Sequence, residues 1–191
     1  MSSRTTVLLL PLLTAAALLA CAELARSGYR AGDDDGGVDG EGGTPADGDL
    51  CPPAEVLHAH NLRRLNQIRA ARRVEQPPPL DPDPCLDQIA TRSLDAWIAG
   101  GPVHGLFEQA CLPRLPSCEC DWEQENSGRS HGSSWKRSID RVLGEMMAEE
   151  FHDGGHFRNI IAPRWTRVGI AIACRLEEGG VTIHLANEFA R

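Results

Sequence analysis

Two histidines and two acids in the second half of the sequence could hold a divalent metal ion. His104 and Glu125 precede a helical pattern, Glu149 stands at its end, and His156 follows directly after a glycine pair. Neutral imidazole and carboxylate are ligands that suit zinc, and a site short of four protein ligands leaves a position for water. Such a water could be activated as in a hydrolase. The alternative interpretation is a hydrogen-bonded polar floor that fixes a cleft.

One candidate nucleophile lies in a stretch rich in glycine and serine. The residues around Ser130, Gly-Arg-Ser-His-Gly, match the G-x-S-x-G nucleophile elbow, with Glu149 and His156 following in the chain order of a triad. That motif requires a sharp turn between a buried strand and a helix. Residues 123–126 are not expected to form a buried strand, and the chain lacks alternating strands and helices. A serine hydrolase acting through Ser130 is therefore only an alternative.

Hydrophobic periodicity predicts the elements that position these residues. Three stretches repeat apolar residues at helical spacing and two alternate them as strands do. Asp83-Pro84 is a helix start, with an N-cap aspartate before a first-position proline, and Gly179-Gly180 is expected to join the strands as a hairpin. Helices before strands predict an α+β domain, with helices packed on a small antiparallel sheet. The expected helices begin near residues 56, 83 and 134, the strands cover 168–174 and 181–185, and residues 105–134 are expected to be rich in loops.

Five arginines gather on the first expected helix, at positions 63, 64, 69, 72 and 73. Few aromatic residues lie among them, so we expect a solvated helix face and no nucleic-acid partner. The whole expected domain, residues 51–191, carries a net charge of −3. Its length is that of one domain with a sizeable core.

Residues 1–20 are expected to be a signal peptide. Arg4 precedes an apolar run over residues 7–20, which is shorter than the roughly 20 apolar residues of a membrane-spanning helix. The run ends in Leu-Leu-Ala before Cys21, which resembles the lipobox of bacterial lipoproteins, where the cysteine is acylated. An acylated Cys21 would anchor the protein to the membrane. We therefore expect an exported protein, lipid-anchored to the bacterial cell envelope, with Ala22 favouring the outer membrane.

The next segment, residues 21–50, is expected to be a disordered tether. It is rich in glycine and aspartate, and its eight acids and two arginines contribute −6 to the chain's net charge of −8. Such a segment buries too little apolar surface to offset its ordering entropy, and like charges extend it.

Six cysteines besides Cys21 suggest disulfide bonds. An even number in a chain bound for an oxidising compartment is expected to be paired, although the sequence does not choose the pairing. They are Cys51, Cys85, Cys111, Cys118, Cys120 and Cys174.

The chain resembles the CAP superfamily, also called the SCP domain. This superfamily includes cysteine-rich secretory proteins, antigen 5 and pathogenesis-related proteins of class 1. The resemblance covers residues 60–189 and rests on the order of short motifs. It implies a secreted α-β-α sandwich with a large cleft, and possible lipid, sterol or protein ligands. The motifs are Leu65-Asn66-Gln67-Ile68-Arg69, Pro79-Leu80, Leu86 to Ala90, His104, Glu125-Asn126, Glu149, Gly155-His156-Phe157 and Val168-Gly169.

The resemblance also implies the cleft residues. Its two histidines and two acids correspond to His104, Glu125, Glu149 and His156, and Glu149 is preferred over Glu150 because Met-Met-Ala-Glu stands like the family's Trp-Tyr-x-Glu. Two departures affect the surrounding loops, since Gly-Glu-Asn appears here as Gln-Glu-Asn and Gly-His-Tyr-Thr-Gln as Gly-His-Phe-Arg-Asn. The neighbouring residues expected to contribute to ligand binding are Asn126, Glu150 and Phe157.

Two classes of function follow. The sequence favours a non-catalytic, cell-surface CAP module that binds a divalent metal, with zinc first, and a small ligand, lipid or partner. The alternative is an extracytoplasmic hydrolase, dependent on metal or on Ser130.

Overall fold

The computed structural model describes residues 50–72, 76–104 and 122–191. The predicted signal peptide, the acylated Cys21 and nearly all of the predicted tether lie outside these residues, as do Cys111, Cys118 and Cys120. Within the described ranges, no helix combines the length and the apolar character that crossing a bilayer requires.

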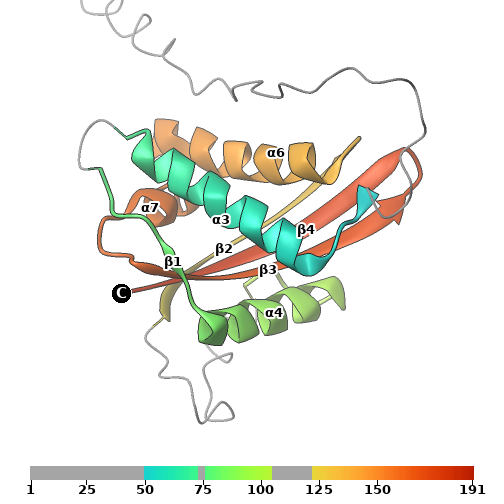
Figure 1. Cartoon of the computed structure of the whole chain (residues 1–191), viewed down its shortest axis with the longest axis horizontal. Coiled ribbons are helices and arrows are strands. Elements are labelled where there is room, and N and C mark those ends of the chain that lie inside the picture. The colour runs from blue at the N-terminus through green and yellow to red at the C-terminus, as the bar shows by residue number, and fades with distance from the viewer. Residues whose placement is uncertain (1–49, 73–75, 105–121) are drawn as a thin grey trace, which may run out of the picture. The chain divides into compact units, whose positions relative to one another are not determined.

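Helices and one mixed sheet make up the described chain (Figure 1). The strands lie in the order β1-β3-β4-β2, with β1 parallel to β3 and the other neighbours antiparallel. The helices are α3 (Ala54–Ala70), α4 (Pro84–Ile98), α6 (Trp135–Ala148), the 3-10 helix η1 (Glu149–His152) and α7 (Gly155–Ile161); the strands are β1 (Asp81–Pro82), β2 (Trp122–Gly132), β3 (Arg167–Glu177) and β4 (Gly180–Ala190).

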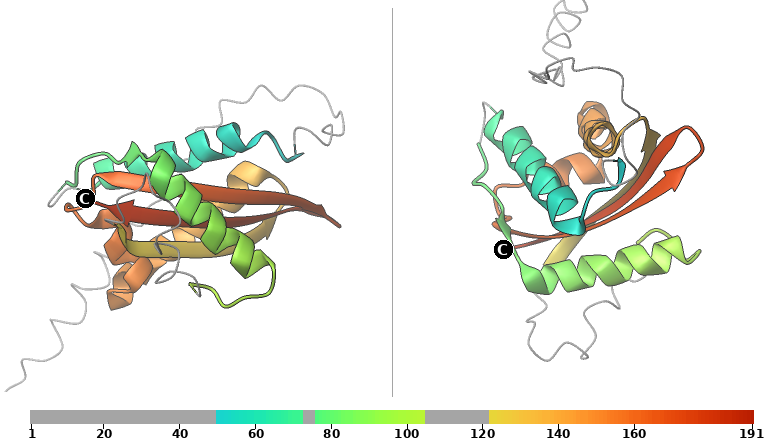
Figure 2. Two further views of the ribbon diagram at one scale, coloured as in Figure 1. Left: turned by 90° about the horizontal axis from the view of Figure 1, so that it is seen from below. Right: turned by 45° about the vertical axis from the view of Figure 1, so that its right-hand side comes forward.

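Helix α4 covers one face of the sheet, and α3 and α6 cover the other (Figures 1 and 2). On the α3 and α6 side, the core is built from fully buried side chains such as Leu65, Ile139 and Leu185. On the α4 side the core is smaller, and Leu94 packs on the alanines of β3 and β4. The predicted α+β architecture, an α-β-α sandwich, is therefore confirmed.

Small residues and a capped helix start bring α4 close to the sheet. The Asp83 carboxylate accepts hydrogen bonds from the backbone N–H groups of Cys85 (2.8 Å) and Leu86 (3.3 Å), as predicted for an N-cap. A Cβ at Gly169 would collide with the backbone of Leu86. Asp87 adds a tie, since its carboxylate accepts from the Ile170 N–H at 2.7 Å. These contacts fix the start of α4 against β3.

The expectation of loops over residues 105–134 is wrong for residues 122–132, which form β2. This strand pairs along its length with β4, for example Asn126 with Asn187 and Ser130 with Ile183. Its sequence is polar throughout, so it lacks the apolar alternation by which strands are recognised. Backbone pairing with an apolar neighbour holds it in the sheet, which is a tertiary effect that local propensity does not report.

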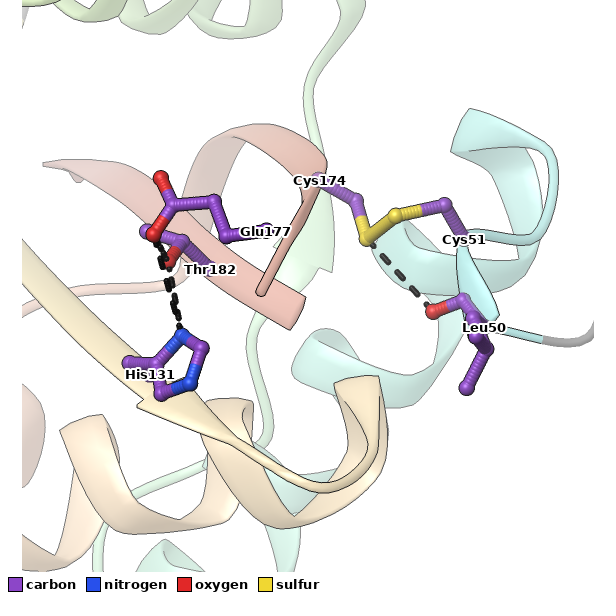
Figure 3. Close-up of a disulfide and its surroundings, with 6 residues drawn as sticks. All are labelled: Leu50, Cys51, His131, Cys174, Glu177 and Thr182. Carbon is purple, nitrogen blue, oxygen red and sulfur yellow. Dashed lines mark hydrogen bonds and ion pairs between the residues drawn. A yellow bond between two sulfur atoms is a disulfide. The ribbon is translucent and has the colours of Figure 1, made fainter. Parts of the chain in front are cut away.

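A disulfide joins the beginning of the domain to the sheet. Cys51 is bonded to Cys174 of β3, with a Cα–Cα distance of 5.6 Å and 123 residues between them in sequence (Figure 3). Cys85 is also disulfide-bonded. The structure thus pairs distant cysteines, as expected for an exported protein.

Candidate functional site

One cavity of about 390 Å³ gathers all four residues that the sequence singled out. They come from four separate places: His104 follows α4, Glu125 lies on β2, Glu149 begins η1 and His156 lies in the first turn of α7. Only the three-layer fold brings such distant positions together. The cavity is lined by His104, Gln124, Glu125, Glu149, His152, Gly154, Gly155, His156 and Asn159.

Each cleft histidine is paired with its own carboxylate. His104 Nδ1 lies 2.6 Å from Glu125 Oε1, and His156 Nδ1 lies 2.6 Å from Glu149 Oε1. The second oxygen of Glu149 accepts from the backbone N–H of His156 at 3.0 Å. Gly154 permits this turn, because a Cβ there would collide with the Glu149 carboxylate. Gly154, two residues before the histidine, is thus a steric requirement of the pair.

The two carboxylates differ in burial, but their pKa values shift in the same direction. The hydrogen bond from Glu125 raises the pKa of His104, although partial burial opposes this. Burial opposes ionisation of Glu125, but hydrogen bonds from His104 and Ser127 outweigh it and lower the pKa of that carboxyl. Glu149 follows the same pattern, with burial opposed by its hydrogen bonds to His156, and its pKa is also lowered. Both carboxylates are therefore charged at neutral pH.

The two imidazoles face each other across the cavity. Their ring centroids are 6.1 Å apart and the ring planes are tilted by 38°. Because each Nδ1 is engaged by a carboxylate, each Nε2 is the nitrogen left for a ligand. A carboxylate bonded to the other ring nitrogen is the usual outer partner of a metal-binding histidine.

Zinc bound to nitrogen at about 2.0 Å fits between two rings at this separation. Among the described residues, however, no group of three or more His, Cys, Asp or Glu side chains is arranged to hold a metal ion. An ion here would therefore have two imidazole ligands, and water or a bound molecule would complete its coordination.

Several residues of the site belong to no motif recognised in the sequence. His152 lines the cavity, as do Gln124 and Asn159. Glu188, on β4, lies fully buried against Glu125. Its position could have been found from the strand pattern, because an acid inside an apolar strand calls for an explanation.

Three expected ligand-binding residues do not line the cavity. Asn126 is buried and structural: its amide donates to the His156 carbonyl (3.0 Å) and accepts from Asn159 (2.8 Å). Glu150 points outward and pairs with Arg72 at 2.9 Å, and Phe157 is buried beneath the same arginine. The acid of the cleft is therefore Glu149.

Ser130 does not form a catalytic triad with the described residues. It lies within β2, paired with Ile183, and not at a turn between a strand and a helix. Its hydroxyl is buried and has no hydrogen-bond partner in the described part of the chain. The Nδ1 of His156 is taken by Glu149. The geometry that a serine nucleophile needs is absent from this region.

Comparisons with known proteins find similarity in three dimensions only. No family model and no curated protein matches the chain. An outer surface protein from Borrelia burgdorferi is 12% identical over 72% of this chain and 94% of its own, with a TM-score of 0.48. A cysteine-rich secretory protein from Staphylococcus aureus is 10% identical over 81% and 44%, with a TM-score of 0.48. An extracellular SCP-domain protein from Bacillus anthracis is 12% identical over 78% and 45%, with a TM-score of 0.47. These values are too low to carry an argument about function, which rests on the residues above.

Proposed function

We propose that this chain is an extracytoplasmic CAP-domain protein, anchored through Cys21, whose cleft binds a divalent metal ion through His104 and His156. The observation that supports this most is the pairing of each imidazole with its own carboxylate at 2.6 Å, in one cavity. Two independent pairs that line the same cavity fit a shared ligand better than a mere polar floor.

The chemistry of the pairs supports zinc. The hydrogen bonds to Glu125 and Glu149 fix the ring orientation and raise the basicity of the nitrogen that binds the ion. The carboxylates act from the outer shell, which revises the expectation that all four residues would be direct ligands. Zinc needs about four ligands, so water or a donor atom of a small ligand would occupy the remaining positions.

A binding role accounts for these residues better than turnover. Both cleft carboxylates are already engaged by imidazoles, so neither is free to act as a general base without breaking its pair. An exposed aromatic ring, that of Phe151, stands beside the cavity-lining Glu149 and His152 and is 81% exposed. It offers an apolar surface at the rim for the rest of a ligand.

Metal binding is tested by zinc titration of the full chain carrying Cys21→Ser, followed by calorimetry. His104→Ala and His156→Ala are each expected to abolish binding without unfolding the domain, because both rings are at the surface of the cavity. Glu125→Gln and Glu149→Gln are expected to weaken it by about 10–100-fold through lost orientation. His58→Gln, which changes a histidine paired with Asp87 outside the cleft, is the matched control. Equal zinc affinity in the double histidine variant and the parent would sink the proposal.

The affinity should also depend on pH in a way that the Glu125 pair sets. Since the pKa of His104 is raised above its ordinary value of about 6.5, protons compete for this imidazole already near neutral pH. Zinc affinity is expected to fall as the pH is lowered through this range. In Glu125→Gln the onset should move to lower pH, which NMR titration of the imidazole checks directly. An unchanged onset would mean that the pair is not formed in solution.

The hydrolase alternative has its own test. Ser130→Ala and His156→Ala variants, assayed on ester and peptide panels with and without zinc, separate the two routes. Turnover that Ser130→Ala abolishes would establish serine chemistry and remove the binding proposal as the main function.

A further inference from the structure

Past the end of α4, the sheet carries a second group of polar side chains on the face that α4 begins to cover. In an antiparallel pair, residues directly opposite share a face. His184 of β4 pairs with Arg129 of β2. Thr182 of β4 pairs with His131 of β2 on one side and with Arg175 of β3 on the other. Trp97, near the end of α4, packs edge-on against His184, with the two ring centroids 5.2 Å apart. We call Arg129, His131, Arg175, Thr182 and His184 the distal face.

The centre of the distal face is buried and incompletely satisfied. His184 is only 9% exposed, and its Nδ1 is closed to solvent without a hydrogen-bond partner among the described residues. Burial and the positive charges of Arg129 and Arg175 lower the pKa of this imidazole. The histidine is therefore neutral at neutral pH, mainly because it is buried, and the two arginines add positive charge beside it in a chain whose net charge is −8.

The two arginines of the distal face are exposed and have no hydrogen-bond or ion-pair partner in the described ranges. One acid, Glu177, stands at the edge of the group. It accepts a hydrogen bond from the Thr182 hydroxyl at 2.7 Å and lies 3.8 Å from His131 Nδ1 (Figure 3). His131 Nδ1 is itself 3.1 Å from the Thr182 oxygen. The hydrogen bond from Thr182, and after it the charge of Arg129, lower the pKa of Glu177. No hydrogen bond or ion pair joins Glu177 to either guanidinium in the described ranges.

We propose that the distal face is a second binding site, separate from the cleft, which takes a phosphate group between Arg129 and Arg175. The two arginines come from β2 and β3, on either side of β4, so their backbones are about 10 Å apart. Side chains of this length can reach one small anion from opposite sides. A tetrahedral oxyanion offers acceptors in both directions, and the guanidinium fork matches it with paired hydrogen bonds.

The phosphate could belong to a soluble ester or to a lipid headgroup. Arg175 directly follows Cys174, whose disulfide to Cys51 is where the expected tether enters the domain. Because successive strand residues point to opposite faces of the sheet, the Cys174 disulfide and Arg175 lie on different faces. A lipid headgroup would therefore reach the distal face through the length of the tether, while a soluble phosphate ester needs no anchor. The chemistry recognised is the same in both cases.

The test uses the full chain carrying Cys21→Ser and measures the Kd for inorganic phosphate at low salt by NMR titration. Arg129→Gln and Arg175→Gln are each expected to weaken binding about tenfold. Glu177→Gln is expected to strengthen it, because it removes a competing negative charge and keeps a hydrogen-bond acceptor for Thr182. Arg92→Gln, an exposed arginine of α4 outside the distal face, is the matched control and should change nothing. His104→Ala should also bind normally, which separates this site from the cleft.

Two further arms identify the source. Co-sedimentation with phosphatidylglycerol vesicles but not phosphatidylcholine vesicles, lost in Arg129→Gln, points to an anionic headgroup. Phosphate binding without co-sedimentation points to a soluble ester. The proposal is overturned if phosphate does not bind at millimolar concentration, or if binding is unaffected by both arginine substitutions.

Discussion

Glu188 is the residue with the most unusual environment in the domain. Its side chain is fully buried beside the Ser93 hydroxyl, and no donor in the described chain stands in hydrogen-bond geometry to its oxygens or to Oε2 of the neighbouring Glu125. Burial, and then the charge of Glu125, raise the pKa of Glu188 to about 9. A proton on Glu188 supplies the missing donor, so the two carboxyls form an acid–carboxylate pair beneath His104.

This pair predicts how stability depends on pH. An acid whose folded pKa is raised stabilises the fold only below its unfolded pKa, and the benefit is lost as the pH rises towards the folded value. Between about pH 4.5 and 9 the free energy of unfolding should fall by about 1.4 kcal/mol per pH unit on this account. Glu188→Gln keeps a donor and cannot ionise, so it should be more stable than the parent by about 3 kcal/mol at pH 7.

Urea unfolding at pH 5 and pH 7.5 measures the effect. The gain in Glu188→Gln should be large at the higher pH and nearly vanish at the lower one. Glu145→Gln, an exposed acid of α6, serves as the control and should show no such trend. A gain of the same size at both pH values would contradict the proton assignment.

At this scale the sequence located the four cleft residues but not their partners. His104 and His156 stand in recognisable short motifs, so their convergence was predictable from the resemblance. Glu188 and His152 belong to no motif, and only the fold decides what a side chain at those positions contacts.

Arg69 shows how one side chain ties α3 to the rest of the fold. It is fully buried, and its guanidinium donates to the carbonyls of Pro78 (2.8 Å), Ile160 (2.7 Å), Ala162 (3.2 Å) and Trp165 (2.8 Å). Burial lowers its pKa to about 10, which still leaves it charged at neutral pH. The expectation of a solvated arginine face on this helix is therefore wrong for Arg69.

Replacing Arg69 should cost far more than replacing its neighbour. Arg69→Met leaves several buried carbonyls without a donor, so we expect a loss of about 3–5 kcal/mol in the free energy of unfolding. Arg72→Met removes a partly exposed pair with Glu150 and the stacking of the guanidinium over Phe157, and should cost about 1–2 kcal/mol. Denaturant midpoints compare the two, and similar losses would show that the carbonyl network is not formed.

Elements with apolar periodicity were predictable, and those held by backbone pairing were not. The third expected helix, from about residue 134, corresponds to α6 at Trp135–Ala148, and the hairpin of β3 and β4 was recognised from alternation around Gly179-Gly180. β2 was missed because its polar side chains, Glu125 among them, serve the site. The short α7 was also missed, since seven residues give too little pattern to recognise.

For the molecule as a whole, the disulfide between Cys51 and Cys174 closes most of the domain into one loop. Its sequence separation of 123 residues predicts a stabilisation of about 5 kcal/mol from loop entropy, because such a crosslink restricts the unfolded chain. Cys51→Ser with Cys174→Ser should lower the melting temperature accordingly. Reduction of the parent should lower it at least as far, because Cys85 is disulfide-bonded as well, and an identical melting temperature in all three samples would contradict the prediction.

The expected anchor is tested at the same scale. Cys21→Ser should release the protein from membranes, because an acidic tether has no affinity of its own for a bilayer. Membrane fractionation after a high-salt wash measures this. A variant that stays with the membrane fraction would show that another part of the chain holds it there.

The same disulfide also decides the path of mechanical force. For a chain held at its N-terminal end, tension reaching Cys51 crosses the sulfur bridge into β3 and bypasses α3. β3 pairs with β4 along eleven residues, from Arg167 with Ala190 to Glu177 with Gly180, so a pull along the strand loads many hydrogen bonds in shear. A ligand gripped in the cleft, where Glu125 of β2 pairs with Glu188 of β4, would be pulled against this sheet. The covalent bridge thus makes the paired strands β3 and β4 bear the load.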